Sequence, residues 1–399
     1  MKVKTIDNID FKGKIVFLRC DFNVPFDSEG KVSDITKIKR HKATIEELVR
    51  KQAKIIIISH LGRPNGKVIN RLSLNCIVDE FAKVMNINEL TVLPFCKAEV
   101  IGNVMREKEK SSITFMENIR FYPEEEENDE KFAKELASVG DYYINDAFSV
   151  SHRKHLSTFG ISKFMPSCIG RSLELELKML NKINDSIDKP VMAIIGGSKI
   201  STKIALLLNL LKRVDFLVIG GAMANTFLLE KGYKIGRSLV EKDKTNIARK
   251  VLDQANENNC TLIIPTDVVT SKSLDDVNSI TSVGVDNIDD NMAIYDVGDK
   301  TIEEITNTMA SCKTIFWNGP LGVYEMEPFD NSTNVVGRTA AILTKGNIIT
   351  SVAGGGDTVA ALNNAGVAGG FSYVSIAGGA LVEWLEGKKL PGLNFLENS

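Results

Sequence analysis

The stretch of sequence from Gly170 to Pro190 reads GRSLELELKMLNKINDSIDKP. Its apolar positions recur at helical spacing with charged residues between them, which predicts one amphipathic helix. These apolar positions are Leu173, Leu177, Leu180 and Ile183. Pro190 then opens a new apolar run, so the helix is expected to join two domains. The chain has 399 residues, more than a single hydrophobic core usually supports, which agrees with two domains.

On both sides of this helix, short apolar runs alternate with segments of helical period. Several runs show no polar alternation, as expected of strands buried on both faces of a parallel sheet. The predicted strands are 14–19, 54–59, 113–116 and 142–145 before the helix, and 191–195, 216–219, 261–264, 314–317, 347–352 and 372–376 after it. Strand followed by helix, repeated, predicts an α/β fold with two doubly wound parallel sheets. The strand count alone would also allow a barrel, but the middle helix argues against one.

Composition restricts the class of protein. Apolar residues make up 43% and charged residues 25%, and no apolar run is long enough to span a membrane. The charged N-terminus lacks the apolar centre of a signal peptide. The six cysteines are scattered without CxxC spacing, which favours reduced thiols and a cytoplasmic location. A net charge of −2 gives no general attraction for nucleic acid or a membrane surface, so a phosphate site needs local basic residues.

Basic residues follow the predicted strands of the first half. Ligands of open α/β sheets bind beyond the carboxyl ends of the strands, so these loops are expected to meet at one edge. They contribute His60, Arg63, Arg120 and Arg153. Arginine binds phosphate and carboxylate through two parallel hydrogen bonds, so the cluster suits a small, multiply charged anion. Four unrelated surface side chains remain the alternative.

Glycines follow the strands of the second half instead. The strand ends read GGSK at 196–199, GG at 220–221, NGP at 318–320, GGGDT at 354–358 and GGA at 378–380. Glycine lets backbone N–H groups approach phosphate oxygens at a helix N-terminus, so this half is expected to bind a nucleotide. Lys199 and Lys203 lie four positions apart at the start of a predicted helix, and each has the reach to contact a phosphate. Asp357 suits either a magnesium ion or a helix cap.

Standard nucleotide signatures are missing. The sequence contains no GxxxxGK[ST] and no GxGxxG after a strand, which excludes P-loop kinases and disfavours a nicotinamide dehydrogenase. Protease and esterase motifs are missing too. An anion-binding half and a nucleotide-binding half together favour phosphoryl transfer by positioning and charge neutralisation. A nicotinamide enzyme and a non-catalytic binding protein remain open at this point.

Several strings resemble the phosphoglycerate kinase family. In the first half they are DFNVP at 21–25, SHLGRP at 59–64, ENIRF at 117–121 and NDAF at 145–148. In the second half they are GGSK at 196–199, WNGPLGV at 317–323, GGGDT at 354–358, LEGK at 385–388 and LPG at 390–392. The strings occur in order from about residue 10 to residue 392, so the resemblance covers nearly the whole chain.

The resemblance implies a fold and a reaction. It implies two Rossmann-like domains, with residues 1–170 and a returning tail at 388–399 binding 3-phosphoglycerate or 1,3-bisphosphoglycerate. Residues 171–188 would form a connecting helix and hinge, and residues 189–387 would bind ADP or ATP with Mg²⁺. The implied enzyme is a phosphotransferase with a carboxyl group as acceptor, a cytoplasmic monomer of glycolysis that closes by hinge bending and transfers the phosphoryl group directly.

The resemblance also assigns residues. The substrate positions would be Asp21, Asn23, Lys37, His60, Arg63, Arg120 and Arg153. The nucleotide positions would be Lys203, Gly298, Glu325, Gly355, Gly356, Asp357 and Thr358, with Asp357 holding the metal. The catalytic positions would be Lys37, Lys199, Gly355 and Gly378.

Two positions depart from the family pattern. The family's catalytic arginine falls at Lys37, which keeps the charge but loses the planar fork. The family's Ser-Thr before the last glycine loop reads Ser375-Ile376, which removes a hydroxyl near the transferred phosphate. These two changes leave a catalytically weak or non-catalytic relative as the alternative reading.

Overall fold

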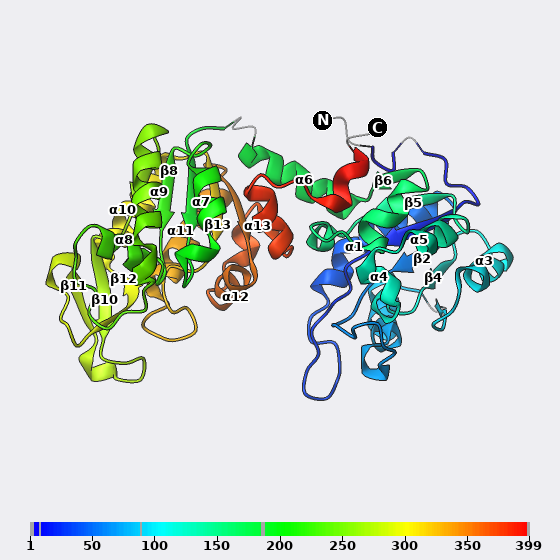
Figure 1. Ribbon diagram of the computed structural model, residues 1–399, viewed down its shortest axis with the longest axis horizontal. Coiled ribbons are helices and arrows are strands. Elements are labelled where there is room, and N and C mark those ends of the chain that lie inside the picture. The colour runs from blue at the N-terminus through cyan, green and yellow to red at the C-terminus, as the bar shows by residue number, and fades with distance from the viewer. Residues whose placement is uncertain (1–3, 8, 88–89, 185–187, 397–399) are drawn as a thin grey trace. The chain divides into compact units, whose positions relative to one another are not determined.

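The computed structural model describes residues 4–7, 9–87, 90–184 and 188–396 (Figure 1). The chain divides into two compact units. Unit 1 comprises Met1–Lys178 together with Lys389–Ser399, and unit 2 comprises Met179–Lys388. Each unit has its own sheet and its own hydrophobic core, so each is described separately.

Unit 1 is built around a parallel sheet, which has six strands within the described residues. In spatial order the strands are β3 (Thr91–Val92), β4 (Ile113–Phe115), β2 (Lys54–Ile58), β1 (Ile15–Arg19), β5 (Tyr142–Asn145) and β6 (Ser167–Ile169). The covering helices are α1 (Thr36–Arg50), α2 (Val78–Met85), α3 (Ala98–Glu107), α4 (Pro123–Glu127) and α5 (Glu130–Ala137).

The longer strands of unit 1, such as β1 and β2, are mostly apolar because both faces of the sheet are covered. Successive residues of a strand point to opposite faces. Val16 and Leu18 of β1 accordingly enter one core cluster, whereas Phe17 between them enters another. All three are fully buried. This arrangement explains the unbroken apolar runs in the sequence.

Unit 2 repeats the architecture with a second parallel sheet, again of six strands in the part of the chain that is described. The spatial order is β15 (Tyr373–Ser375), β14 (Thr350–Gly354), β13 (Thr314–Asn318), β7 (Val191–Ile195), β8 (Phe216–Ile219) and β9 (Thr261–Ile263). Its helices are α7 (Ile204–Leu210), α8 (Ala224–Glu230), α9 (Thr245–Glu257), α10 (Asp299–Ser311), α11 (Asn331–Lys345), α12 (Gly356–Asn364) and α13 (Gly379–Leu385). The prediction of an α/β fold with two doubly wound parallel sheets is thus confirmed.

Some strands were not predicted from the sequence. Unit 2 also contains a three-stranded antiparallel sheet in the order β11 (Thr281–Gly284), β10 (Asp267–Ser271), β12 (Ala293–Val297). In unit 1, the short strands β3 and β6 were missed as well. All of these are short or carry polar residues, so they lack the apolar run on which the prediction relied.

Two segments connect the units along the chain. The predicted joining helix is α6 (Arg171–Asn184), which begins in unit 1 and continues past the unit boundary at Lys178. The C-terminal tail returns to unit 1, as predicted. There the Asn145 side chain donates to the carbonyl of Gly392 at 2.9 Å, and the N–H of Gly392 donates to the carbonyl of Ser151 at 2.8 Å.

Candidate functional site

The basic residues of unit 1 follow four strands that are direct neighbours in the sheet, β4, β2, β1 and β5. Because these strands are parallel, their carboxyl ends lie at one edge. Asp21 and Asn23 follow β1, His60 and Arg63 follow β2, Arg120 follows β4, and Arg153 follows β5. Lys37 is contributed by the first turn of α1. The topology therefore places the predicted anion-binding residues at the same sheet edge.

Asp21 is the most extensively bonded of these residues. Its Oδ2 accepts from Lys37 Nζ at 2.9 Å and from the Ser149 hydroxyl at 2.6 Å, and its Oδ1 accepts from the Asn23 N–H at 3.0 Å. Burial opposes ionisation, but Lys37 and the hydrogen bond from Ser149 hold the pKa of Asp21 well below its usual value. Asp21 is therefore a fixed, ionised acceptor.

His60 is fixed by Arg19, the last residue of β1. An Arg19 N–H donates to His60 Nδ1 at 3.2 Å, and since a guanidinium only donates, the imidazole proton lies on Nε2. Burial, together with the charges of Arg19 and Arg120, lowers the pKa of His60 well below its usual value although Asp21 opposes this shift. His60 is thus a neutral imidazole. The bond to Nδ1 sets the orientation of the ring and therefore the direction of its Nε2–H donor.

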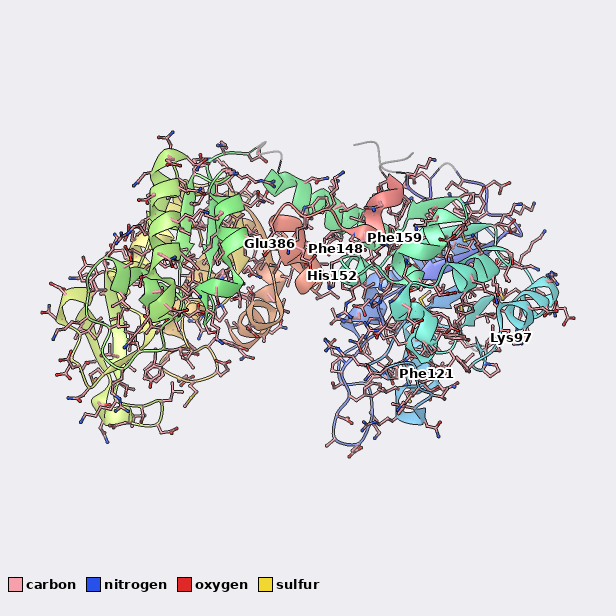
Figure 2. All side chains as sticks on the ribbon, in the orientation of Figure 1. Lys97, Phe121, Phe148, His152, Phe159 and Glu386 are labelled. Carbon is pink, nitrogen blue, oxygen red and sulfur yellow. The ribbon has the colours of Figure 1, made fainter. Side chains whose placement is uncertain are left out.

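Arg120 lies in the turn η3 (Ile119–Phe121), next to Phe121, which is labelled in Figure 2. Its guanidinium donates to the carbonyl of Gly62 at 2.7 Å and lies 3.5 Å from Glu126. Burial and the nearby charge of Arg153 lower the pKa of Arg120 to about 10. Two arginines are therefore close enough to repel each other, which an anion bound between them would relieve.

The two remaining arginines differ in exposure. Arg63 is exposed, and its neighbour Gly62 is tied to the Asn23 side chain by an N–H···O bond of 2.8 Å. Arg153 is half-buried, and its Nε lies 3.4 Å from Nε2 of His152, labelled in Figure 2. Neither forms an ion pair with a carboxylate within the described residues. Both are thus available to a bound anion.

Sequence reasoning missed the buried groups that support this cluster. Arg19 is 1% exposed, and its Nε donates to the Ser157 hydroxyl at 2.9 Å. The Ser157 hydroxyl in turn donates to Glu125 at 2.7 Å. Glu125 belongs to α4, and its carboxylate is buried although the neighbouring residues of this helix are also acidic. The sequence did contain a signal for Arg19, because a charged residue at the end of an apolar strand such as β1 indicates a buried charge with partners.

Glycine loops follow five neighbouring strands of unit 2, in the order β15, β14, β13, β7 and β8. Several of these glycines leave no room for a side chain. A Cβ on Gly196 would lie 1.9 Å from the carbonyl oxygen of Pro320, and a Cβ on Gly355 would lie 2.5 Å from the Asn318 side chain. Gly355 also has a φ of 103°, which favours glycine. The close packing of these loops therefore explains the glycines.

A cavity of about 510 Å³ opens at this edge of unit 2. Its wall combines glycine backbone with apolar and aromatic side chains, which suits a flat heteroaromatic ring. Among the predicted residues it includes Glu325 and Asp357. Gly221, Asn225, Leu239, Tyr295, Asp296 and Tyr324 also line it. About half of this wall comes from β12 and the loop after β13. The loop includes part of the predicted NGP and WNGPLGV strings, whereas β12 was not predicted.

The predicted lysines of unit 2 are not equivalent. The expected continuous helix is a 3₁₀ turn η7 (Ile200–Thr202) followed by α7, with Lys203 at the break, so the two lysines do not share one helical face. Lys203 binds the Asn318 side chain, and burial lowers its pKa although Asp357 and Glu386 oppose this shift. Lys199 is exposed and lies near Glu241.

Three predicted glycines lie at helix starts. Gly355 precedes α12, Gly298 precedes α10, and Gly378 precedes α13. A Cβ on Gly298 would lie 2.3 Å from Asp267 Oδ2, so the Asp267 carboxylate leaves no room for a side chain at this position. Gly298 is buried and does not line the cavity. The Thr358 hydroxyl accepts from the Gly319 N–H at 2.7 Å, which joins the loop after β13 to the first turn of α12.

Asp357 lies in the first turn of α12 without capping it, because Gly355 is the N-cap and no side chain caps the helix. Its carboxylate instead lines the cavity. The described residues contain no group of three or more metal-binding side chains. A single carboxylate with phosphate oxygens from a nucleotide is the usual protein ligand set of Mg²⁺, so the residues present fit a nucleotide-bound magnesium ion.

Comparisons with known proteins agree with this geometry. The family model described as phosphoglycerate kinase matches residues 6–388. A phosphoglycerate kinase from Cereibacter sphaeroides (strain ATCC 17025 / ATH 2.4.3) is 43% identical over 390 residues, which are 98% of each chain. One from Rhodopseudomonas palustris is 45% identical over 394 residues, 99% of this chain and 98% of the relative.

A solved structure is similar as well. Phosphoglycerate kinase from Coxiella burnetii superposes with a TM-score of 0.90 at 36% identity, covering 99% of this chain and 98% of that one. Among the described residues, every helix is too short or too polar to cross a membrane. A family model and relatives that each span nearly the full chain establish its membership: this chain belongs to the phosphoglycerate kinase family.

Proposed function

We propose that this chain catalyses the reversible transfer of a phosphoryl group from 1,3-bisphosphoglycerate to ADP, giving 3-phosphoglycerate and ATP. The observation that carries the proposal is the pairing of two different strand-end sites on two similar sheets. One is a cluster of fixed cations, and the other is a glycine-lined cavity. Family membership supports the same reaction.

Unit 1 binds the phosphoglycerate in this proposal. Arg63, Arg120 and Arg153 meet the phosphate and carboxylate groups, because guanidinium forks match both in geometry. The neutral His60 offers its Nε2–H as a further donor. Asp21 only accepts, so it suits the single hydroxyl of 3-phosphoglycerate, with Asn23 and Lys37 holding it in place.

Unit 2 binds the nucleotide. The base enters the cavity, and Glu325, which lines it, accepts from the ribose hydroxyls in this proposal. The phosphates meet the backbone N–H groups at Gly355 and Gly356, the Thr358 turn and the amino group of Lys203. Gly298 contributes by leaving room beside Asp267 at the start of α10.

Catalysis then rests on positioning and charge neutralisation. The transferring phosphoryl spreads negative charge over three oxygens, and Lys37, Lys199 and the N–H groups near Gly355 and Gly378 are the donors that would meet it. Mg²⁺ held by Asp357 and the nucleotide would neutralise phosphate charge. Direct transfer requires the two bound substrates to meet, so the proposal includes hinge bending when both are bound.

Lys37 and Ile376 set the rate in this proposal rather than the identity of the reaction. Lys37 retains a positive charge beside Asp21 at 2.9 Å. Ile376 is half-buried before the Gly378 turn and offers no hydroxyl. The comparisons provide no support for a non-catalytic protein, since the relatives are named as kinases. We further propose that the enzyme acts as a cytoplasmic monomer without a nucleic-acid partner.

A coupled assay tests the function. Purified protein with 3-phosphoglycerate and MgATP should form ADP at a rate that depends on magnesium. Omitting either substrate is the matched control. Binding of both ligands without turnover would replace the kinase with a binding protein, and turnover of another acid in place of 3-phosphoglycerate would change the substrate.

A further inference from the structure

His41 is a buried histidine that belongs to none of the roles described above. It lies on α1, one helical turn after Lys37, and is 3% exposed. Its ring packs edge-on against Phe22, with ring centroids 5.4 Å apart. Both ring nitrogens have partners within hydrogen-bond distance. The imidazole is thus hydrogen-bonded on both sides and lies beside the anion-binding residue Asp21.

The two partners of His41 determine its protonation. The backbone N–H of Asp21 approaches Nε2 at 3.0 Å, and a backbone N–H only donates, so Nε2 must carry a lone pair. Nδ1 lies 2.8 Å from Asp146 Oδ2, so Nδ1 carries the proton and donates it to this carboxylate. His41 is therefore a neutral imidazole in the Nδ1–H form, the opposite tautomer from His60.

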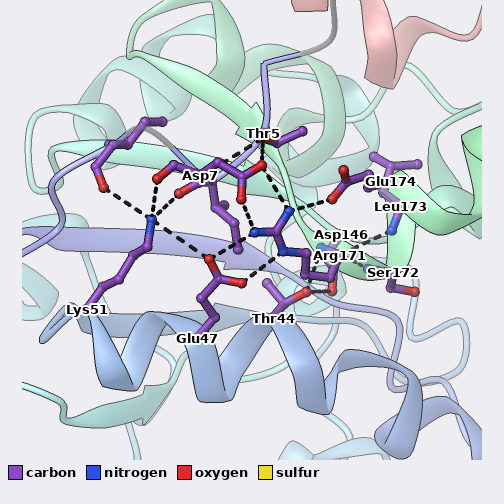
Figure 3. Close-up of polar contacts among 12 residues, drawn as sticks. Thr5, Asp7, Thr44, Glu47, Lys51, Asp146, Arg171, Ser172, Leu173 and Glu174 are labelled. Atoms are coloured by element: carbon purple, nitrogen blue, oxygen red, sulfur yellow. Dashed lines mark hydrogen bonds and ion pairs between the residues drawn. The ribbon is translucent and has the colours of Figure 1, made fainter.

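Asp146 is itself firmly held. It follows β5 directly and is 1% exposed. Its Oδ2 also accepts from the Thr44 hydroxyl at 2.8 Å, and its Oδ1 accepts from the N–H groups of Ser172 and Leu173 at 2.9 and 3.2 Å (Figure 3). A buried carboxylate with four donors cannot rotate without losing several of them. It therefore fixes both the tautomer and the orientation of His41.

We propose that His41 is a positioning residue of the anion site, which holds Asp21 in place through its backbone while Lys37 holds the same residue through its carboxylate. The proposal rests on the proposed function in one respect, that Asp21 contacts the phosphoglycerate. Helix α1 thus forms two hydrogen bonds with Asp21, one to its backbone N–H and one to its carboxylate. Through Asp146, the same hydrogen-bonded series reaches the first turn of α6, the helix that leaves unit 1.

The protein offers a matched set of variants. His41→Phe keeps a ring against Phe22 but removes both hydrogen bonds and leaves the Asp21 N–H without an acceptor. His41→Gln retains one donor and one acceptor about as far apart as the two ring nitrogens. Thr44→Val is the control, because Thr44 donates to Asp146 and accepts from the Arg171 N–H yet does not contact Asp21. Asp146 keeps His41, Ser172 and Leu173 as donors in this variant, so His41 stays held.

Kinetics separate positioning from general stability. We expect His41→Phe to raise the KM for 3-phosphoglycerate by about tenfold, with the KM for MgATP unchanged. His41→Gln should recover most of this loss, and Thr44→Val should leave both KM values unchanged even if it lowers the Tm. Equal changes in His41→Phe and Thr44→Val, or no recovery in His41→Gln, would overturn the proposal.

A spectroscopic test does not depend on turnover. The chain has four histidines, so their imidazole ¹⁵N resonances can be assigned in the intact protein by substitution. His41 should show the Nδ1–H tautomer at neutral pH, and the Asp21 amide proton should exchange faster in His41→Phe than in Thr44→Val. The Nε2–H tautomer or an unaffected Asp21 amide would refute the positioning role. A wild-type chain that passes this test but does not turn over 3-phosphoglycerate would refute the proposed function alone.

Discussion

Units 1 and 2 contain the same kind of sheet, but different kinds of residue follow the carboxyl ends of its strands. In unit 1, charged side chains follow the strand ends and are held by neighbouring side chains, as Asp21 is by Lys37 and Ser149. In unit 2, glycines bring backbone N–H groups to the same edge, and few charged side chains are needed. A compact anion is thus met by side chains, and an extended nucleotide by backbone.

The two sites also differ in what stabilises them. A cluster of cations is stable only when buried acceptors fix it, which is why Arg19, Ser157 and Glu125 form a series beneath the surface of unit 1. The glycine loops of unit 2 pack closely only without side chains at certain positions, because a Cβ on Gly196 or Gly319 would separate the loops. Substitutions should therefore damage the two units for different reasons.

The largest effect is expected from adding one methyl group to unit 2. Gly196→Ala would place a Cβ 1.9 Å from the Pro320 carbonyl oxygen, so the loops after β7 and β13 must separate. We expect unit 2 to lose about 3 kcal/mol or more and ADP binding to fail, with 3-phosphoglycerate binding retained. Urea unfolding and calorimetry with each ligand would measure this.

Gly369→Ala is the control for this experiment, because a Cβ there meets nothing within 4 Å. It should leave both stability and ADP binding nearly unchanged. Equal damage by the two substitutions would show that close loop packing does not explain the glycines of unit 2.

The next effect concerns a side chain of unit 1. Arg63→Ala should weaken 3-phosphoglycerate binding by about tenfold or more, since a charge-assisted hydrogen bond contributes roughly 1.5–3 kcal/mol. Affinity for ADP should not change. Arg71→Ala removes another exposed arginine of unit 1, from η1 (Asn70–Leu72), and should affect neither ligand. If Arg63→Ala weakened both ligands alike, the division of labour between the units would be wrong.

A gain of function is expected at Lys37. Lys37→Arg should raise the rate of the transfer step about five- to thirtyfold, or about 1–2 kcal/mol, because a guanidinium can contact Asp21 and a phosphoryl oxygen together. Single-turnover measurement avoids interference from product release. Lys37→Ala should cause a large loss in the same assay. An unchanged rate in both variants would remove Lys37 from the reacting centre.

The smallest effect compares the acid response of the two units. Burial raises the pKa of Asp296 in unit 2 to about 7, against hydrogen bonds from Ser332 and Val297. The folded unit then holds a proton that the unfolded chain has lost, so this contribution is full below pH about 4 and disappears as the pH rises through about 7. Unit 2 should gain about 1 kcal/mol between pH 8 and pH 6.

Unit 1 should respond in the opposite direction and at lower pH. Burial disfavours ionisation of Glu125, but His155 and Arg19 hold its pKa below the usual value, so its contribution is lost as the medium becomes acidic. Asp296→Asn should abolish the response of unit 2 and leave that of unit 1 intact. Denaturant midpoints for each unit across this pH range give the answer, and a pH dependence that survives in Asp296→Asn would exclude Asp296 as its source.

The sequence predicted those parts of the fold that depend on local pattern. Long apolar strands such as β7 and β8 were located within their observed bounds, because burial on both faces leaves an unbroken run. Short or partly polar strands such as β3 and β10 have no such run. Their position depends on pairing with distant segments, which a local window cannot detect.

The same division holds for the site. Residues that follow a strand, such as His60 and Arg120, were predicted to lie together because topology alone brings strand ends to one edge. Their supports were not, since His41 and Asp146 lie 105 positions apart and meet only after folding. Periodicity also failed at Lys203, where the helix is interrupted and the lysine binds Asn318.

The returning tail has a consequence for how the chain is made. Asn145 and Ser151 of unit 1 bond to Gly392, yet all of unit 2 is translated between them. While the ribosome is still synthesising unit 2, the nascent unit 1 therefore lacks partners that do not yet exist. Unit 1 is therefore translated before unit 2 but can be completed only after the segment around Gly392 has been made.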